Sequence, residues 1–154
     1  MTVHDASIVM PDGGEVIEFG PIRMRILEDG SATGHRLAIS EVTLAPRGSG
    51  PVLHRHARHD EGFYILSGTA RFTIGERERD VPPGTLVVVP PDVPHTFANP
   101  TDEPVVFLAT FSPDLFVRYF REVRDALADG RELTGQAERR LLSRYGTTPV
   151  TGHT

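Results

Sequence analysis

Apolar and polar residues alternate along many short segments of this chain, which is the period of a β-strand with one buried face. Residues 22–27, for example, alternate Ile, Met and Ile with two Arg before ending at Leu27. The segments end at Gly, Pro, Asp or Asn, which are turn-forming residues. The pattern predicts strands at residues 16–19, 22–27, 37–44, 52–56, 62–66, 70–74, 85–89, 95–98 and 105–111. Strands at this spacing, without a helical period between them, indicate an all-β sandwich or barrel.

A helical period begins only after this β region. Ser112, Pro113 and Asp114 supply a predicted N-cap, a Pro at the first helical position and an early acidic residue. An apolar face follows, made of Leu115, Phe116, Tyr119, Phe120, Val123 and Leu127. We expect this face to pack against the barrel. A second, shorter helix is expected from Thr134 to Tyr145, with Gly146 as its stop.

The length of 154 residues fits one domain with its own core. We expect a flexible N-terminal arm at residues 1–14, a barrel at residues 15–111, a helical extension at residues 112–146 and a frayed tail at residues 147–154. The predicted architecture is therefore one β domain followed by one or two C-terminal helices.

Residue types that are missing narrow the chemistry. The chain has no Cys, no Trp and no Lys, so all 16 basic residues are Arg. These absences exclude thiolate nucleophiles, Cys-ligated zinc, iron–sulfur clusters and lysine Schiff bases. The sequence also contains no Gly-x-Ser-x-Gly elbow, no phosphate-binding loop and no dinucleotide fingerprint.

The charge distribution limits the classes of molecule that this protein is expected to bind. The formal net charge is −5, and opposite charges are interleaved, as in Glu76-Arg77-Glu78-Arg79-Asp80. This argues against a nucleic-acid or anionic-membrane partner and leaves a small-molecule substrate. No segment reaches the roughly 18 apolar residues that a membrane helix needs, and residues 1–14 lack the pattern of a signal peptide. We therefore expect a soluble, cytoplasmic protein.

Two histidines give the strongest chemical signal. His54 and His56 lie two positions apart on a predicted strand, so both imidazoles leave the same face, with Cα atoms roughly 6 to 7 Å apart. Glu61 follows a predicted turn at residues 57–60 and can point into the space that the two histidines face. His95 opens a later strand. Three imidazoles and one carboxylate suit a divalent transition metal, with positions left open for substrate or oxygen.

The spacing of these residues matches two motifs. The first runs Gly48, five residues, His54, one residue, His56, four residues, Glu61, six residues and Gly68. The second runs Gly84, five residues, Pro90, one residue, Asp92, two residues, His95, three residues and Asn99. Both resemble the signatures of the cupin superfamily, except that the family has Gly where this chain has Asp92. Asp is one of the few residues that tolerate a positive φ, so we expect the turn to form.

The resemblance implies a cupin jelly-roll β-barrel in which His54, His56, Glu61 and His95 hold one divalent metal. Because only 15 residues separate Gly68 from Gly84, the chain resembles small single-domain cupins. The strands before the motifs and the helix after them resemble quercetin dioxygenase-like cupins. The family also implies a homodimer that pairs through edge strands. The ligand set does not choose among iron, nickel, cobalt, manganese, copper and zinc.

Three apolar residues are candidates for a substrate pocket. If Glu61 faces inward, Phe63 and Ile65 share its face, and Phe97 shares the face of His95. These side chains either line an apolar cavity for a flat or aromatic ligand or simply fill a small barrel. Tyr64, which has the opposite parity, is expected to face outward.

The other histidines give weaker signals. His4, His35 and His153 have no partners at ligand spacing, so they are not assigned to the site. His59 lies in the turn before Glu61, where it either contacts the rim of the site or, as we prefer, is a solvated loop residue.

Three functions are compatible with these residues. The first is a metal-dependent dioxygenase acting on a small enolic or phenolic compound, flavonol-like or catechol-like, with Glu61 as the catalytic base. The second is a redox-neutral isomerase or cyclase of secondary metabolism that uses the metal as a Lewis acid. The third is a non-catalytic module that binds a metal or a small molecule. We rank the functions in this order.

Overall fold

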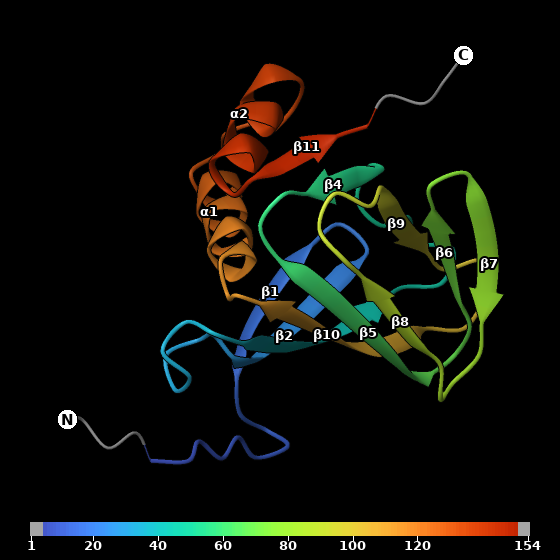
Figure 1. Ribbon diagram of the computed structural model, residues 1–154, viewed down its shortest axis with the longest axis horizontal. Coiled ribbons are helices and arrows are strands. Elements are labelled where there is room, and N and C mark those ends of the chain that lie inside the picture. The colour runs from blue at the N-terminus through green and yellow to red at the C-terminus, as the bar shows by residue number, and fades with distance from the viewer. Residues whose placement is uncertain (1–4, 151–154) are drawn as a thin grey trace.

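The computed structural model describes residues 5–150, and two β-sheets form its body (Figure 1). The elements are β1 (Glu15–Phe19), β2 (Ile22–Glu28), β3 (Ala38–Leu44), β4 (His54–His56), β5 (Asp60–Ser67), β6 (Ala70–Ile74), β7 (Arg77–Val81), β8 (Leu86–Val89), β9 (His95–Ala98), β10 (Val105–Ser112), α1 (Phe116–Ala128), α2 (Gln136–Arg144) and β11 (Thr147–Pro149). One sheet has six strands in the order β1-β2-β3-β10-β5-β8, and the other has five in the order β11-β4-β9-β6-β7. The predicted all-β jelly roll with C-terminal helices is confirmed.

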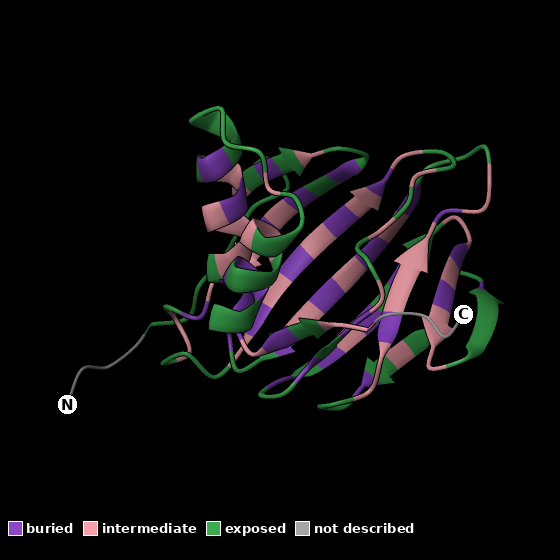
Figure 2. Cartoon of the chain, turned by 90° about the horizontal axis from the view of Figure 1, so that it is seen from above, coloured by how far each residue is buried: buried purple, intermediate pink, exposed green. Residues whose placement is uncertain are grey.

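The inner faces of the two sheets form the core. Burial alternates residue by residue along β3 and β10, which gives these strands the banded colouring of Figure 2. The inward residues meet in an aromatic cluster with ring centroids 5.0 to 6.3 Å apart, made of Phe63, Phe72, Phe97 and Phe107. The two-residue period of the sequence therefore decides which side chains lie between the sheets.

The two helices lie together at one end of the molecule (Figures 1 and 2). Phe116 and Val123 of the predicted apolar face are buried, and so is Val117, which lies outside that face, whereas Leu127 is 46% exposed. Nη2 of Arg121 lies 3.0 Å from Oε1 of Glu15 and 3.0 Å from Oδ2 of Asp29, which ties α1 to the β1–β2 hairpin and the loop after it. Within residues 5–150, no helix is long and apolar enough to cross a membrane.

The predicted start of the first helix is wrong. Ser112 is the last residue of β10, and its hydroxyl donates to a backbone carbonyl before β3 at 2.9 Å. The helix begins at Phe116, and Leu115 occupies the N-cap position without a side-chain hydrogen bond. Asp114 instead accepts a hydrogen bond from Nδ1 of His35 at 2.7 Å. Ser112 and Asp114 therefore form hydrogen bonds with the loop before β3 instead of capping the helix.

Two strands lie outside the sequence prediction. β7 carries four charged residues and lacks the apolar alternation that marks a strand, yet it pairs with β6 along its whole length. β11 pairs with β4, so the prediction of a frayed tail is wrong for residues 147–149. Residues 5–14 of the predicted arm form no helix or strand. The outer parts of the arm and the tail, residues 1–4 and 151–154, lie outside the described residues.

The turns of the two motifs have the predicted backbone geometry. The φ angles are 76° at Gly68 and 85° at Gly84, and Asp92 adopts 67° where the family has Gly. Asn99 fixes its own turn, because its Oδ1 accepts hydrogen bonds from the backbone N–H and the hydroxyl of Thr101 at 2.9 and 2.8 Å. The Asp92 departure therefore leaves the turn before His95 intact.

Candidate metal centre

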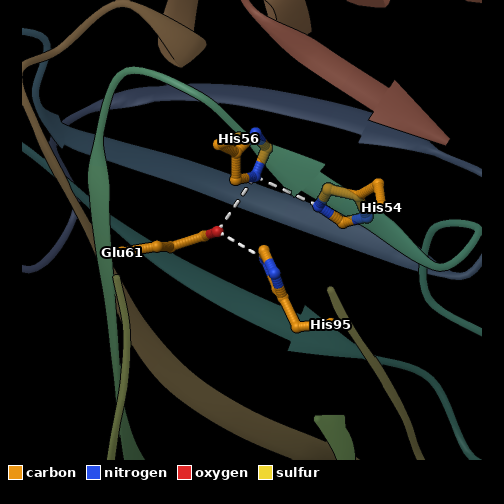
Figure 3. A group of neighbouring side chains, drawn as sticks. All are labelled: His54, His56, Glu61 and His95. Atoms are coloured by element: carbon orange, nitrogen blue, oxygen red, sulfur yellow. Dashed lines mark hydrogen bonds and ion pairs between the residues drawn. The ribbon is translucent and has the colours of Figure 1, made fainter. Parts of the chain in front are cut away.

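Four buried side chains converge between the two sheets (Figure 3). His54 and His56 come from β4, Glu61 from β5 and His95 from β9, and β4 pairs with β9 so that His54 lies opposite His95. Oε2 of Glu61 lies 2.8 Å from Nε2 of His95 and 3.1 Å from Nε2 of His56. The Nε2 atoms of His54 and His56 lie 3.1 Å apart. The structure thus brings together the four residues that the sequence analysis assigns to the metal.

Each imidazole is oriented by a hydrogen bond at its other nitrogen. Nδ1 of His54 and Nδ1 of His95 each donate to a backbone carbonyl two residues earlier, at 2.7 and 2.9 Å. Nδ1 of His56 donates to the hydroxyl of Thr147 at 2.7 Å, and that hydroxyl donates onward to a backbone carbonyl at 3.3 Å. In its neutral form, which is the form that binds metal, each imidazole carries one proton, so these bonds would leave its lone pair on Nε2. All three lone pairs face the space beside Glu61.

A positive charge is needed to make this arrangement favourable. The lone pairs of His54 and His56 face each other, and the carboxylate of Glu61 adds negative charge at the same place. A divalent cation accepts an electron pair from each of the four groups at once. Metal bonds of about 2.1 Å that meet at a right angle place neighbouring ligand atoms about 3 Å apart. The four ligand atoms lie within 4.8 Å of one another, so the residues fit a single ion.

Burial and the interactions among the clustered side chains determine the protonation states of His54, Glu61 and His95. Burial, reinforced by His95 and His56, lowers the pKa of His54 to about 4. Burial favours the neutral form of Glu61, but its contacts with His56 and His95 outweigh burial and hold its pKa well below the usual range. Burial also disfavours the charged form of His95, but hydrogen bonding to Glu61 outweighs burial and raises the pKa of that imidazole. Glu61 is therefore ionised and His54 is neutral at pH 7, the states in which they bind metal.

The match to known proteins covers the segment that contains all four residues. Residues 40–111 match the family model of the cupin domain. This segment of the chain is a cupin domain. Its resemblance to quercetin dioxygenase-like cupins in particular stays a prediction.

Relatives of this cupin share the fold. MJ1618, an uncharacterized protein of Methanocaldococcus jannaschii, is 28% identical over 106 residues, which cover 62% of this chain and 84% of the relative. A sugar phosphate isomerase from Silicibacter pomeroyi has a TM-score of 0.60 at 23% identity, over 69% of this chain and 75% of that chain. A predicted oxalate decarboxylase from Thermotoga maritima has a TM-score of 0.65 at 19% identity, over 70% of this chain and 99% of that chain. At these identities, the two solved structures support the fold alone.

A cavity of about 550 Å³ lies beside the metal centre of this cupin. His54 and Glu61 form part of its wall, whereas His56 and His95 do not line it. The aromatic residues of the wall are Phe19, Phe63, Phe97, Phe107, Phe111, Phe116, Tyr119 and Phe120. The accessible side of the four-residue cluster therefore faces a mainly apolar space.

The C-terminal helices supply the outer wall of this cavity. Residues of α1 and of the segment 131–134 lie across it from the sheets. Arg131 and Glu132 are exposed and Glu138 is half-buried, so the charged side chains of the wall other than Glu61 lie toward solvent. The apolar face of α1 thus does more than pack against the barrel, because it also shapes the cavity.

The predicted pocket residues separate into two groups. Phe63 and Phe97 line the cavity beside the metal centre. Ile65 is fully buried but does not line the cavity, because it lies two positions further along β5 from Phe63. Tyr64 faces outward, as predicted, with 44% of its surface exposed.

The preferred interpretation of His59 as a solvated loop residue is wrong. Only 1% of its surface is exposed, and its ring packs 4.0 Å from the ring of His56 and 5.5 Å from those of Phe111 and Phe116, measured between centroids. Neither ring nitrogen has a hydrogen-bond partner within the described residues. Burial lowers the pKa of His59 to about 3. This neutral side chain therefore acts as a packing residue behind His56.

Several functional residues lie outside the sequence prediction. Thr147 orients His56 from a segment with no strand signal of its own. Phe107 and Phe111 line the cavity, and their shared parity on a predicted strand is a signal that identifies them. No local pattern indicates that Phe116 and Tyr119 of α1 face the cavity, because that depends on where the helix packs.

Proposed function

We propose that this cupin is a metal-dependent enzyme whose reaction is the dioxygenation of a small enolic or phenolic compound of the flavonol or catechol type. The observation that carries the proposal is the contact of His54 and Glu61 with an aromatic cavity of about 550 Å³. A flat ring system can stack on these aromatic walls and place its hydroxyl at the polar end. A sugar phosphate is disfavoured, because its polar groups would lack partners along such walls.

One divalent transition metal would be held by His54, His56, Glu61 and His95. Bound there, it would supply a Lewis acid for a substrate oxyanion and, if redox-active, a route for electrons to dioxygen. Iron, nickel, cobalt, manganese and copper are the candidates for oxygen chemistry, whereas zinc favours a redox-neutral reaction.

Glu61 is the group of this chain that we assign to proton transfer. Its Oε2 is engaged by His56 and His95, whereas its Oε1 has no hydrogen bond within the described residues. Because Glu61 lines the cavity and is ionised, its carboxylate can accept the proton of a substrate hydroxyl.

The proposal is tested by oxygen uptake. Protein loaded with each candidate metal is incubated with flavonols and catechols, and dioxygen consumption is measured together with product formation. We expect turnover that requires metal and falls at least about 100-fold in Glu61→Gln, since general-base catalysis contributes about 10²–10⁴-fold. Glu76→Gln, a change of the same kind at an exposed turn residue, is the matched control and keeps full activity.

The same experiment also tests the other two functions. Product formation without dioxygen contradicts the dioxygenase and supports a redox-neutral isomerase or cyclase. A compound that binds the metal-loaded protein and is recovered unchanged, with or without oxygen, supports a non-catalytic binding protein. Elemental analysis of protein purified without added metal identifies the metal to use.

A further inference from the structure

A second cavity, of about 690 Å³, lies between the β6–β7 hairpin and β8. It shares no lining residue with the aromatic cavity. β7 ends one sheet and β8 ends the other, so neither has a second strand partner within residues 5–150. The apolar surface of this β7–β8 cleft includes Phe72, Ile74, Val81 and Val87. The cleft is therefore an apolar opening between two sheet edges.

Two arginines point into the β7–β8 cleft. In the antiparallel register of the hairpin, Arg79 lies opposite Phe72 and Arg77 lies opposite Ile74. Residues directly opposite in such a pair share a face of the sheet, and Phe72 is on the inner face because it is 2% exposed. Both arginines accordingly belong to the lining of the cleft.

Asp80 also lines the cleft, but its carboxylate and that of Glu78 are engaged by Arg71. Nε of Arg71 lies 2.7 Å from Oδ1 of Asp80 and 3.5 Å from Oε1 of Glu78. Within the described part of the chain, Arg77 and Arg79 form no ion pair and no side-chain hydrogen bond. Arg77 and Arg79, both exposed, are therefore the charged side chains of the cleft that have no ion-pair partner within the described residues.

We propose that the β7–β8 cleft binds a small organic acid. Its carboxylate would pair with Arg77 and Arg79, whose Cα atoms are roughly 6 to 7 Å apart, close enough for both long side chains to reach one anion. Its apolar chain or ring would lie on Phe72 and Val87, which line the same cleft. A polyanion fits less well, because Asp80 lines the cleft and Glu78 lies on the same strand.

The test is an NMR titration of the isotope-labelled full chain with 4-phenylbutyrate as the probe. We expect saturable shifts in amides of residues 72–88. The double variant Arg77→Gln/Arg79→Gln should weaken binding about tenfold, since hydrogen bonds to charged groups are lost. Arg139→Gln/Arg140→Gln, a double change at exposed positions of α2 that line neither cavity, is the matched control and leaves the affinity within about twofold. The uncharged analogue 4-phenylbutanol should bind about tenfold more weakly than the acid.

Two results overturn the proposal. One is a titration in which only residues of the aromatic cavity shift, and the other is unchanged affinity in the double variant. Either result leaves the two arginines with a single role, as inward charges that keep the edges of β7 and β8 from pairing with other chains. Neither result bears on the dioxygenase, because the cleft and the metal centre have no residue in common.

Discussion

The hydroxyl of Thr147 accepts a hydrogen bond of 2.7 Å from Nδ1 of His56, although 91 positions separate the two residues. β11 makes this contact by pairing Thr147 directly with His56 of β4. The bond holds the His56 ring and leaves the lone pair of Nε2 directed at Glu61.

Thr147→Val is expected to weaken metal binding about tenfold, because the loss of a hydrogen bond to a metal-ligating His typically has this effect. The measurement is a competition titration with a chelator. Thr148→Val, at the neighbouring exposed position, is the control and keeps the affinity. Thr147→Ser, which retains the hydroxyl, should bind metal almost as the original protein does. Equal affinities for Thr147→Val and Thr148→Val would show that the bond does not orient His56.

Metal binding is expected to stabilise the fold. A free metal concentration of 100 times Kd adds about 2.7 kcal/mol to the free energy of unfolding, or roughly 5–10 °C in the unfolding midpoint for a chain of this size. The midpoint is followed by circular dichroism with and without metal. His54→Ala should abolish the shift, whereas His35→Ala, outside the cluster, should keep it. A shift that survives in His54→Ala places the ion elsewhere.

His59→Leu is expected to raise the free energy of unfolding by about 1 kcal/mol. The change removes two buried nitrogens that have no hydrogen-bond partner in residues 5–150 and keeps a similar volume. His59→Ala should instead destabilise by about 2 kcal/mol, because it opens a hole behind His56. Both are measured by urea unfolding of the metal-free protein. If the Leu variant is as destabilised as the Ala variant, the imidazole nitrogens form bonds that stabilise the fold.

Asp29 is expected to contribute to acid unfolding. Hydrogen bonds from Ser31, followed by those from Arg121, lower its pKa from 3.8 to about 2. A carboxyl with a lowered pKa in the folded state adds stability above pH 3.8, and this contribution is lost as the pH falls from 3.8 toward 2. Asp29→Asn should therefore make the free energy of unfolding less dependent on pH in that window.

The control for Asp29 is Ser31→Ala. It removes the hydroxyl contact and leaves the hydrogen bonds from the backbone N–H of Ser31 and from Arg121, so it should reduce the pH dependence only in part. Urea unfolding at several pH values between 2 and 5 gives the slopes. The same slope in Asp29→Asn as in the original protein would contradict the assignment.

The parts of the structure that depend on the local sequence pattern can be predicted from the sequence. His54 and His56 share a face because a strand has a period of two, and Glu61 reaches the same space because a short turn precedes it. The spacing of His95 identifies it through the second motif. Strand alternation likewise places Phe63 inside and Tyr64 outside.

The parts of the structure that depend on tertiary contacts cannot be predicted from the sequence. Thr147 joins the site because β11 pairs with β4, and His59 is buried because Phe111 and Phe116 pack against it. β7 has no apolar alternation that would identify it as a strand from the sequence. It forms a strand because its backbone pairs with β6. The homodimer and the cytoplasmic location stay predictions.

Part of the cavity wall comes from a stretch of the chain that supplies none of the four candidate metal ligands. The four candidate ligands lie between positions 54 and 95, inside the matched cupin domain, whereas much of the outer cavity wall comes from α1 and residues 131–134, beyond position 111. Mutations in the helical segment can therefore change the shape of the cavity while leaving the four candidate ligands unchanged.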